Sequence, residues 1–85
     1  MNIQGTVKLV TAPEQVSEKL TKQLLIVEYA ENEKYPETIS FEAINDKCRI
    51  IENLQPGESV NVHFNLKGRE WNGKYFNTLS VWKVE

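Results

Sequence analysis

The sequence has a single cysteine, Cys48, and no apolar run long enough to cross a membrane. One thiol excludes an intrachain disulfide and a zinc site built from several cysteines. The opening residues, MNIQGTVKLV, lack the basic and apolar segments of a secretory signal peptide. We therefore expect a cytoplasmic protein without a membrane partner, in which Cys48 is a small buried apolar residue.

Sequence motifs for enzymatic chemistry are also missing. There is no glycine-rich phosphate loop, no nucleophile elbow and no pair of metal ligands at helical spacing. His63 is the only histidine, and no carboxylate pair lies at motif spacing from it, so we assign it neither catalysis nor a metal. A chain of 85 residues forms one domain with one modest core. We expect a protein that is not an enzyme and needs no cofactor.

Charged residues of both signs are frequent, but they are unevenly distributed along the chain. The formal net charge is −2. From Leu66 to Glu85 there are four cations and two anions, a local charge of +2, which leaves −4 for the first 65 residues. A basic end on an acidic body is compatible with a surface that binds anions.

Segments in which apolar and polar residues alternate, together with one continuous apolar and β-branched run at residues 23–30, predict five strands. The expected strands cover residues 3–9, 23–30, 38–43, 59–71 and 74–84. Gly5, inside the first of them, indicates a bulge or a sharp bend. The polar segment 11–22, which contains Pro13, is predicted to be a connection with room for a helical turn.

One segment has a helical pattern instead. Cys48, Ile51 and Leu54 recur at every third residue. Asn45 is placed to cap the first turn, and the Pro-Gly at 56–57 ends the segment. A single mainly β domain over residues 1–85, with one short helix between its third and fourth strands, has the layout of the five-stranded OB-fold barrel. An SH3-like barrel is the competitor, but its helical element normally precedes the last strand.

The last two expected strands are joined by Asn72-Gly73, the strongest short signal for a two-residue hairpin turn. This turn pairs Trp71 with Lys74 and fixes the pairs below it, and side-chain alternation then sorts the residues between two faces. The face expected to point into the barrel carries Val60, Val62, Phe64, Leu66, Leu79 and Val81. The outer face is expected to carry Lys67, Arg69, Trp71, Lys74, Phe76 and Thr78, with His63 opposite Trp82.

Rings interleaved with cations on an exposed ribbon suit a single-stranded nucleic acid, because rings stack on bases and cations follow the phosphates. We predict that Trp71 and Phe76 stack on bases. Phosphates would be contacted by Lys67, Arg69 and Lys74.

Two tyrosines are candidates for the rim of this site. Tyr35, beside Pro36, is either a stacking platform or the anchor of a turn, and Tyr75 lies next to the hairpin turn. The ribbon itself has an ordinary structural alternative, because Arg69 can simply stack on Phe76 across the two strands.

Four stretches carry a resemblance to known proteins: Asp46-Lys47 at the start of the expected helix, the Pro-Gly at 56–57, REWNG at 69–73 and WKVE at 82–85. Over residues 20–85 the chain resembles bacterial single-stranded-DNA-binding proteins of the OB-fold type. It is most similar to a family of short bacterial and phage OB-fold proteins of unassigned function. In the single-stranded-DNA-binding proteins a tryptophan after basic residues at the end of the fourth strand stacks on DNA. The resemblance implies this role for Trp71, with Arg69 as the basic residue.

We therefore expect a non-catalytic protein that binds single-stranded DNA, or RNA, through the aromatic and basic face of the last hairpin. The competing interpretation is a protein-interaction or self-assembly module that uses the same exposed ribbon. An oligosaccharide-binding barrel is a third, since OB-folds also bind such ligands. Residues 24–27 are apolar on both faces of their strand and Trp82 is expected outside the barrel, which favours a homodimer or a homotetramer.

Overall fold

The computed structural model describes residues 1–29 and 34–85, which form a mainly β structure with one short helical segment. Its elements, in chain order, are β1 Asn2–Val10, β2 Glu14–Ser17, β3 Leu20–Tyr29, β4 Glu37–Ile44, the 3₁₀ turn η1 Asn45–Lys47, α1 Cys48–Ile51, β5 Ser59–Trp71 and β6 Lys74–Val84. The five expected strands are all present. Ala30, the expected end of the second, lies outside the described residues.

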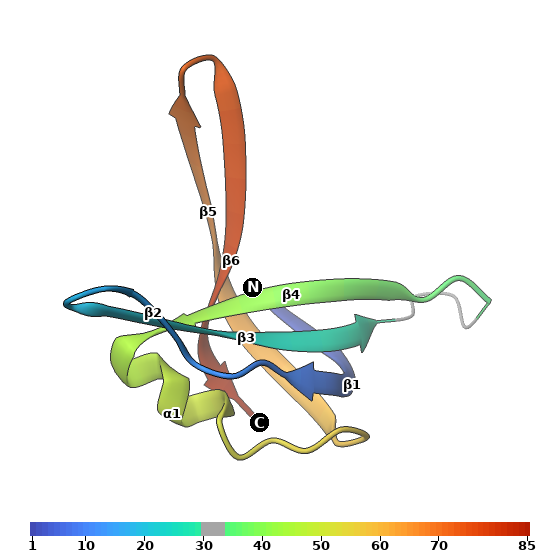
Figure 1. Ribbon diagram of the computed structural model, residues 1–85. Coiled ribbons are helices and arrows are strands. Elements are labelled where there is room, and N and C mark those ends of the chain that lie inside the picture. The colour runs from blue at the N-terminus through green and yellow to red at the C-terminus, as the bar shows by residue number, and fades with distance from the viewer. Residues whose placement is uncertain (30–33) are drawn as a thin grey trace.

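Five of these strands close a barrel, from which the end of the β5–β6 hairpin projects (Figure 1). Their order is β1-β5-β6-β4-β3, and β1 closes the circle by pairing with β5 through its first half and with β3 through its second. Neighbouring strands are antiparallel except β4 and β6, which pair in parallel at Glu42 and Ser80. This order, with the helix between β4 and β5, is that of the OB-fold and confirms the predicted fold class.

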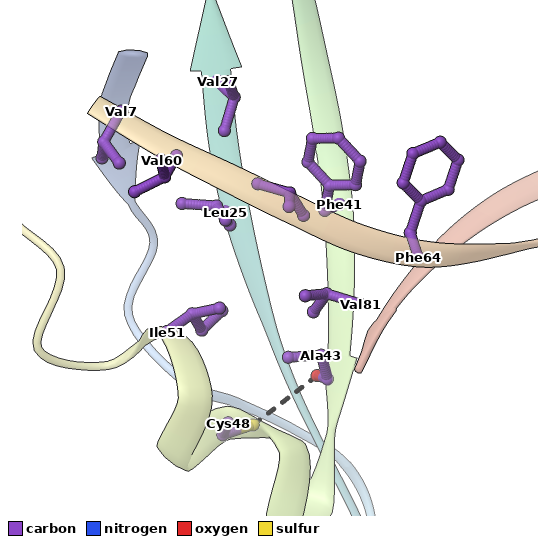
Figure 2. Packing of buried hydrophobic residues seen from close by; sticks show 11 residues of the cluster. Val7, Leu25, Val27, Phe41, Ala43, Cys48, Ile51, Val60, Phe64 and Val81 are labelled. Carbon is purple, nitrogen blue, oxygen red and sulfur yellow. Dashed lines mark hydrogen bonds between the residues drawn. The ribbon is translucent and has the colours of Figure 1, made fainter. Parts of the chain in front are cut away.

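The core fills the barrel and is closed at one end by α1. The residues with the most deeply buried side chains are Val7, Leu25, Val27, Phe41, Ala43, Ile51, Val62 and Val81 (Figure 2). The rings of Phe41 and Phe64 pack at 5.2 Å between centroids. Cys48 is buried as predicted, and its Sγ lies 3.5 Å from the carbonyl oxygen of Ala43. Burial, helped by the nearby charge of Glu52, raises the pKa of this thiol, so Cys48 is neutral at ordinary pH.

Gly5 lies where β1 passes close to β3. A Cβ atom there would be 2.5 Å from the carbonyl oxygen of Glu28 and 2.5 Å from Cγ1 of Val27. The backbones can approach this closely because glycine has no side chain. The irregularity in the pairing of β1 falls between Val7 and Leu9, so the predicted bulge lies near Gly5 and not at it.

The segment 11–22 is not the simple connection that its polarity predicted. It contains β2, whose four residues are all exposed and which pairs with the start of β3 through Glu14, Gln15 and Ser17. The hydroxyl of Thr21 in β3 donates a hydrogen bond of 2.9 Å to Oε1 of Gln15 in β2. Hydrophobic alternation cannot reveal a strand that buries neither face, which is why β2 was missed.

The predicted helix exists but is shorter, and it begins differently. Asn45 is the first residue of η1, has a positive φ of 50° and does not cap the helix with its side chain. Its Oδ1 instead accepts a hydrogen bond of 2.9 Å from the backbone N–H of Thr21. Asparagine tolerates this left-handed conformation, and here it fastens η1 to β3. Leu54 follows α1 as a partly buried residue that packs against the core.

Candidate functional site

The register of the β5–β6 hairpin is the one that the sequence predicted. Trp71 pairs with Lys74, and the pairing continues without a shift down to Phe64 and Val81. Both turn residues have positive φ, 51° at Asn72 and 74° at Gly73, as a two-residue hairpin turn requires.

Below Phe64 the register shifts by one residue. His63 pairs with Lys83 and not with Trp82 as predicted, because β6 contains one extra residue at this point. The rings of His63 and Trp82 are still neighbours, with centroids 5.3 Å apart. Trp82 is 42% exposed, on the outside of the barrel.

The hairpin continues well beyond the barrel, which corrects one prediction about its faces. Leu66 was expected in the interior, but its side chain is 58% exposed. The barrel partners run out before this point, because β1 pairs with β5 only as far as His63 and β4 meets β6 at Ser80. Residues 66–79, called the distal hairpin below, therefore project outward from the barrel (Figure 1), and only their base at Leu79 packs against the core. The other predicted interior residues are buried, or half-buried in the case of Leu79.

The predicted cations and rings gather on the distal hairpin. Trp71 at its end is 63% exposed and Phe76 is 41% exposed. The guanidinium carbon of Arg69 lies 5.4 Å from the centre of the Phe76 ring, so the expected cation–π contact across the strands is present. Lys67 and Lys74 are exposed on the same two strands.

A groove of about 730 Å³ separates the distal hairpin from the strands beside it. One wall is the hairpin, with Lys67, Gly68, Arg69, Phe76, Asn77 and Thr78. The opposite side is formed by Val16 of β2, Leu20 and Lys22 of β3, and Glu42 and Ile44 of β4. Lys67, Arg69 and Phe76, three of the six predicted site residues on the hairpin, thus face a surface of three apolar side chains and one ion pair. Trp71 and Lys74 lie beyond the groove, at the end of the hairpin.

The groove continues into a side hollow of about 470 Å³ between β4 and β6. Lys22 and Glu42 line both the groove and the side hollow. Nζ of Lys22 is 3.8 Å from Oε2 of Glu42, so the two opposite charges balance each other where the groove meets the hollow. Leu24 lines the side hollow, whereas Leu25 and Val27 are in the core. The strand with two apolar faces therefore builds the core with one face and the floor of this surface with the other.

Comparison with known protein families assigns the chain to one of them. A family described as a domain of unknown function, DUF3127, matches residues 2–85. The chain belongs to this family. No curated protein matches the sequence. The prediction of a family without an assigned function is thereby confirmed, while the resemblance to single-stranded-DNA-binding proteins stays a prediction.

The two tyrosines of this DUF3127 domain do not line the groove. Tyr35 is 67% exposed in the segment before β4, where Nζ of Lys34 lies 5.9 Å from its ring centre. Its segment is at the opposite end of the β3–β4 ladder from Ile44, which lines the groove. Tyr75 is 76% exposed and pairs with Glu70 on the distal hairpin.

Sequence reasoning missed the side of the groove that faces the hairpin. The residues concerned are Val16, Leu20, Lys22, Glu42 and Ile44. A usable signal existed, because OB-folds bind ligands on the second and third barrel strands and the loop between the first two. In the DUF3127 domain these are β3, β4 and the segment that contains β2.

A polar cluster lies elsewhere on the DUF3127 domain, at the lower end of the hairpin. Nε2 of His63 and Oε1 of Glu85 are 2.7 Å apart, and Nζ of Lys83 is 3.3 Å from the same oxygen. The hydrogen bond with His63, and then that with Lys83, lower the pKa of Glu85. Within residues 1–29 and 34–85 no group of metal-ligating side chains is present, and no helix there could span a membrane.

Proposed function

We propose that this DUF3127 domain binds single-stranded nucleic acid, with DNA as the main ligand, in the groove beside the distal hairpin. The observation that carries the proposal is the composition of the groove. A wall with two cations and an aromatic ring faces three apolar side chains and the Lys22–Glu42 ion pair across a space of about 730 Å³. Such a groove suits a ligand that is charged along one edge and flat and apolar along the other.

A single strand has those properties. Its bases would lie between Phe76 and the apolar surface of Val16, and its phosphates would follow Lys67 and Arg69 at the outer edge. Trp71 and Lys74, at the end of the hairpin, would extend the same path. The position supports this assignment, because the corresponding barrel strands and loops of OB-folds bind oligonucleotides and oligosaccharides.

The small number of cations favours single strands over duplex DNA. Residues 66–79 carry three cations and one anion, on a chain with a net charge of −2. Non-specific duplex binding depends on many phosphate contacts, which three cations cannot supply. Stacking adds about 1–3 kcal/mol per base and is available only where bases are unpaired. We propose that the domain acts without catalysis, in the cytoplasm.

Protein docking is the second candidate function for the same surface. It is favoured by two side chains of the distal hairpin that do not line the groove, Leu66 and Tyr75, which are 58% and 76% exposed. Exposed apolar residues on a projecting hairpin are typical of a surface that contacts another protein.

Titration of a fluorescently labelled oligo-dT with the wild-type protein at low salt tests the nucleic-acid function. We expect anisotropy to rise with saturation in the micromolar range, and an excess of unlabelled oligo-dT to reverse it. Duplex DNA of the same length should compete poorly. No change in anisotropy at tens of micromolar protein would exclude nucleic-acid binding and leave protein docking.

A further inference from the structure

The distal hairpin has a free strand edge on β6. From Lys74 to Leu79 each residue pairs with β5 on one side. On the other side, within the described residues, β4 joins β6 at the single pair Glu42–Ser80. The backbone N–H and C=O groups along this edge are therefore open to another strand, as on the edge of any sheet.

The two free edges of the hairpin differ in their chemistry. The free part of β5 carries Lys67, Arg69 and Glu70, and charged side chains of this kind keep foreign strands away from an edge. The free part of β6 carries one cation, Lys74 at its end, and then reads Tyr75-Phe76-Asn77-Thr78-Leu79 without a charge. Tyr75, Phe76 and Thr78 favour strands, so β6 is the edge that can accept a further strand.

We propose that the free edge of β6 pairs with the same edge of a second copy of this chain. The two β6 strands run antiparallel about a two-fold axis near Phe76, so that the two hairpins form one four-stranded sheet. In this register Phe76 lies opposite Phe76 of the second copy, and Tyr75 lies opposite its Asn77. Lys74 then faces Thr78, and no like charges meet.

Pairing of the β5 edges of two copies would bring cations opposite each other, so a second copy pairs through β6. An antiparallel pair with a two-fold axis places residues of the same face opposite each other. With the axis at Gly68, Lys67 would face Arg69 of the other copy. With the axis at Arg69 or Lys67, that cation would face itself. On β6 the only cation of the free edge, Lys74, lies at its end.

The barrel leaves space for the second hairpin. With the axis at Phe76, the turn residue Gly73 of one copy comes opposite Leu79 of the other. Leu79 borders the side hollow of about 470 Å³, whose other border is Thr38–Ser40 of β4. The side hollow can thus receive the turn of the second copy.

Pairing about this axis joins the two candidate nucleic-acid surfaces. Rotation about an axis perpendicular to the sheet keeps each face of a hairpin on the same side. The rings and cations of both copies therefore line one continuous surface. The paired edge comprises residues 74–79 of each copy, whereas standard stable interfaces involve roughly 20–30 residues per partner, so we expect dimerisation in the micromolar range.

Sedimentation velocity without nucleic acid, from about 10 to 500 µM protein, tests the proposal independently of the proposed function. We expect the mass to rise with concentration from 9.8 kDa towards twice that value. The double variant Tyr75→Lys/Asn77→Lys places two lysines of one copy opposite two of the other, and it should stay monomeric. The double variant Tyr75→Glu/Asn77→Glu should stay monomeric for the same reason, and an equimolar mixture of the two should dimerise.

The matched control is Asn65→Lys/Leu66→Lys, which adds the same charge to exposed positions of β5 and should dimerise like the wild type. Circular dichroism of every variant establishes that it is folded. A wild-type protein that stays at 9.8 kDa at all concentrations would overturn the proposal. So would a lysine variant that still dimerises, or a mixture that stays monomeric.

Discussion

The rings of the distal hairpin differ in how much of their surface a ligand can reach. One face of Phe76 is occupied by the guanidinium of Arg69, at 5.4 Å from the ring centre. Trp71 is larger, 63% exposed and at the end of the hairpin. Trp71 therefore offers the most stacking surface, and Phe76 with Arg69 offers a preformed combination of ring and charge.

Replacement of Trp71 by alanine should weaken the binding of oligo-dT by about 1–3 kcal/mol, the contribution of one stacked base. Anisotropy of a labelled oligonucleotide is the suitable measurement, because the variant loses a fluorescent residue. The matched control is Trp82→Ala, which removes the tryptophan that packs on His63 on the outside of the barrel and should leave the affinity unchanged. Equal losses in both variants would contradict the assignment of Trp71.

Gly5 contributes to the packing of β1 on β3 and does not line the groove. The variant Gly5→Ala should lower the free energy of unfolding by about 1–3 kcal/mol, because the added carbon overlaps the backbone of β3. Urea unfolding measures this loss. In the control Gly68→Ala the nearest atom, Oδ1 of Asn77, is at 3.4 Å, so the change should stay within about 0.5 kcal/mol. A neutral Gly5→Ala would show that β1 and β3 can separate at little cost.

At the scale of elements, the sequence predicts local geometry better than the extent of the barrel. The Asn72-Gly73 turn and a period of two were enough to predict the register from Trp71 down to Phe64. They could not show where β5 and β6 leave the barrel, because that depends on β1 and β4, which are distant in sequence. Leu66 was misplaced for this reason.

For the candidate site, too, the sequence predicted the part that depends on local geometry and missed the part that depends on packing between distant segments. The hairpin wall of the groove follows from one local turn, and Lys67, Arg69 and Phe76 were identified in this way. The opposite side depends on β2, which buries no side chain, and on the packing of three strands around it. Sequence periodicity contains no information about such a juxtaposition. Asn45 illustrates the same limit, since its hydrogen bond reaches across to Thr21.

The turn of the hairpin can be tested as an element through Gly73, whose φ is 74°. A β-branched residue in this conformation costs about 1–2 kcal/mol, so Gly73→Val should loosen the distal hairpin. We expect faster hydrogen exchange in residues 67–78, weaker oligo-dT binding and an almost unchanged thermal midpoint, because the hairpin stands clear of the core.

The control for the turn is Gly57→Val. Gly57 has a φ of 94° and lies in the loop before β5, with no atom within 4 Å of an added Cβ. The backbone penalty is similar, but the loop is outside the groove, so oligo-dT affinity should not change. If Gly57→Val lowers the affinity as much as Gly73→Val does, the loss reflects general destabilisation and not the shape of the hairpin.

At the scale of the whole molecule, the fold separates charge. Residues 66–79 carry a formal charge of +2 in a chain of net charge −2. The distal hairpin projects from the barrel (Figure 1), so this local positive charge lies on a protruding part of the molecule. Binding of an anionic strand would then be concentrated on a few contacts, and its strength would depend strongly on ionic strength.

That dependence gives the most direct distinction between nucleic-acid binding and protein docking. If Lys67, Arg69 and Lys74 each contact one phosphate, the logarithm of the oligo-dT affinity should fall with the logarithm of salt concentration with a slope of about −2, since each contact contributes about 0.7 on a single strand. The variants Lys67→Gln and Arg69→Gln should each flatten the slope by about 0.7. The control Lys83→Gln, at an exposed position of β6 outside the distal hairpin and 3.3 Å from Glu85, should leave the slope unchanged. A slope near zero in the wild-type protein would mean that the cations do not meet phosphates, and the exposed rings would then be a surface for another protein.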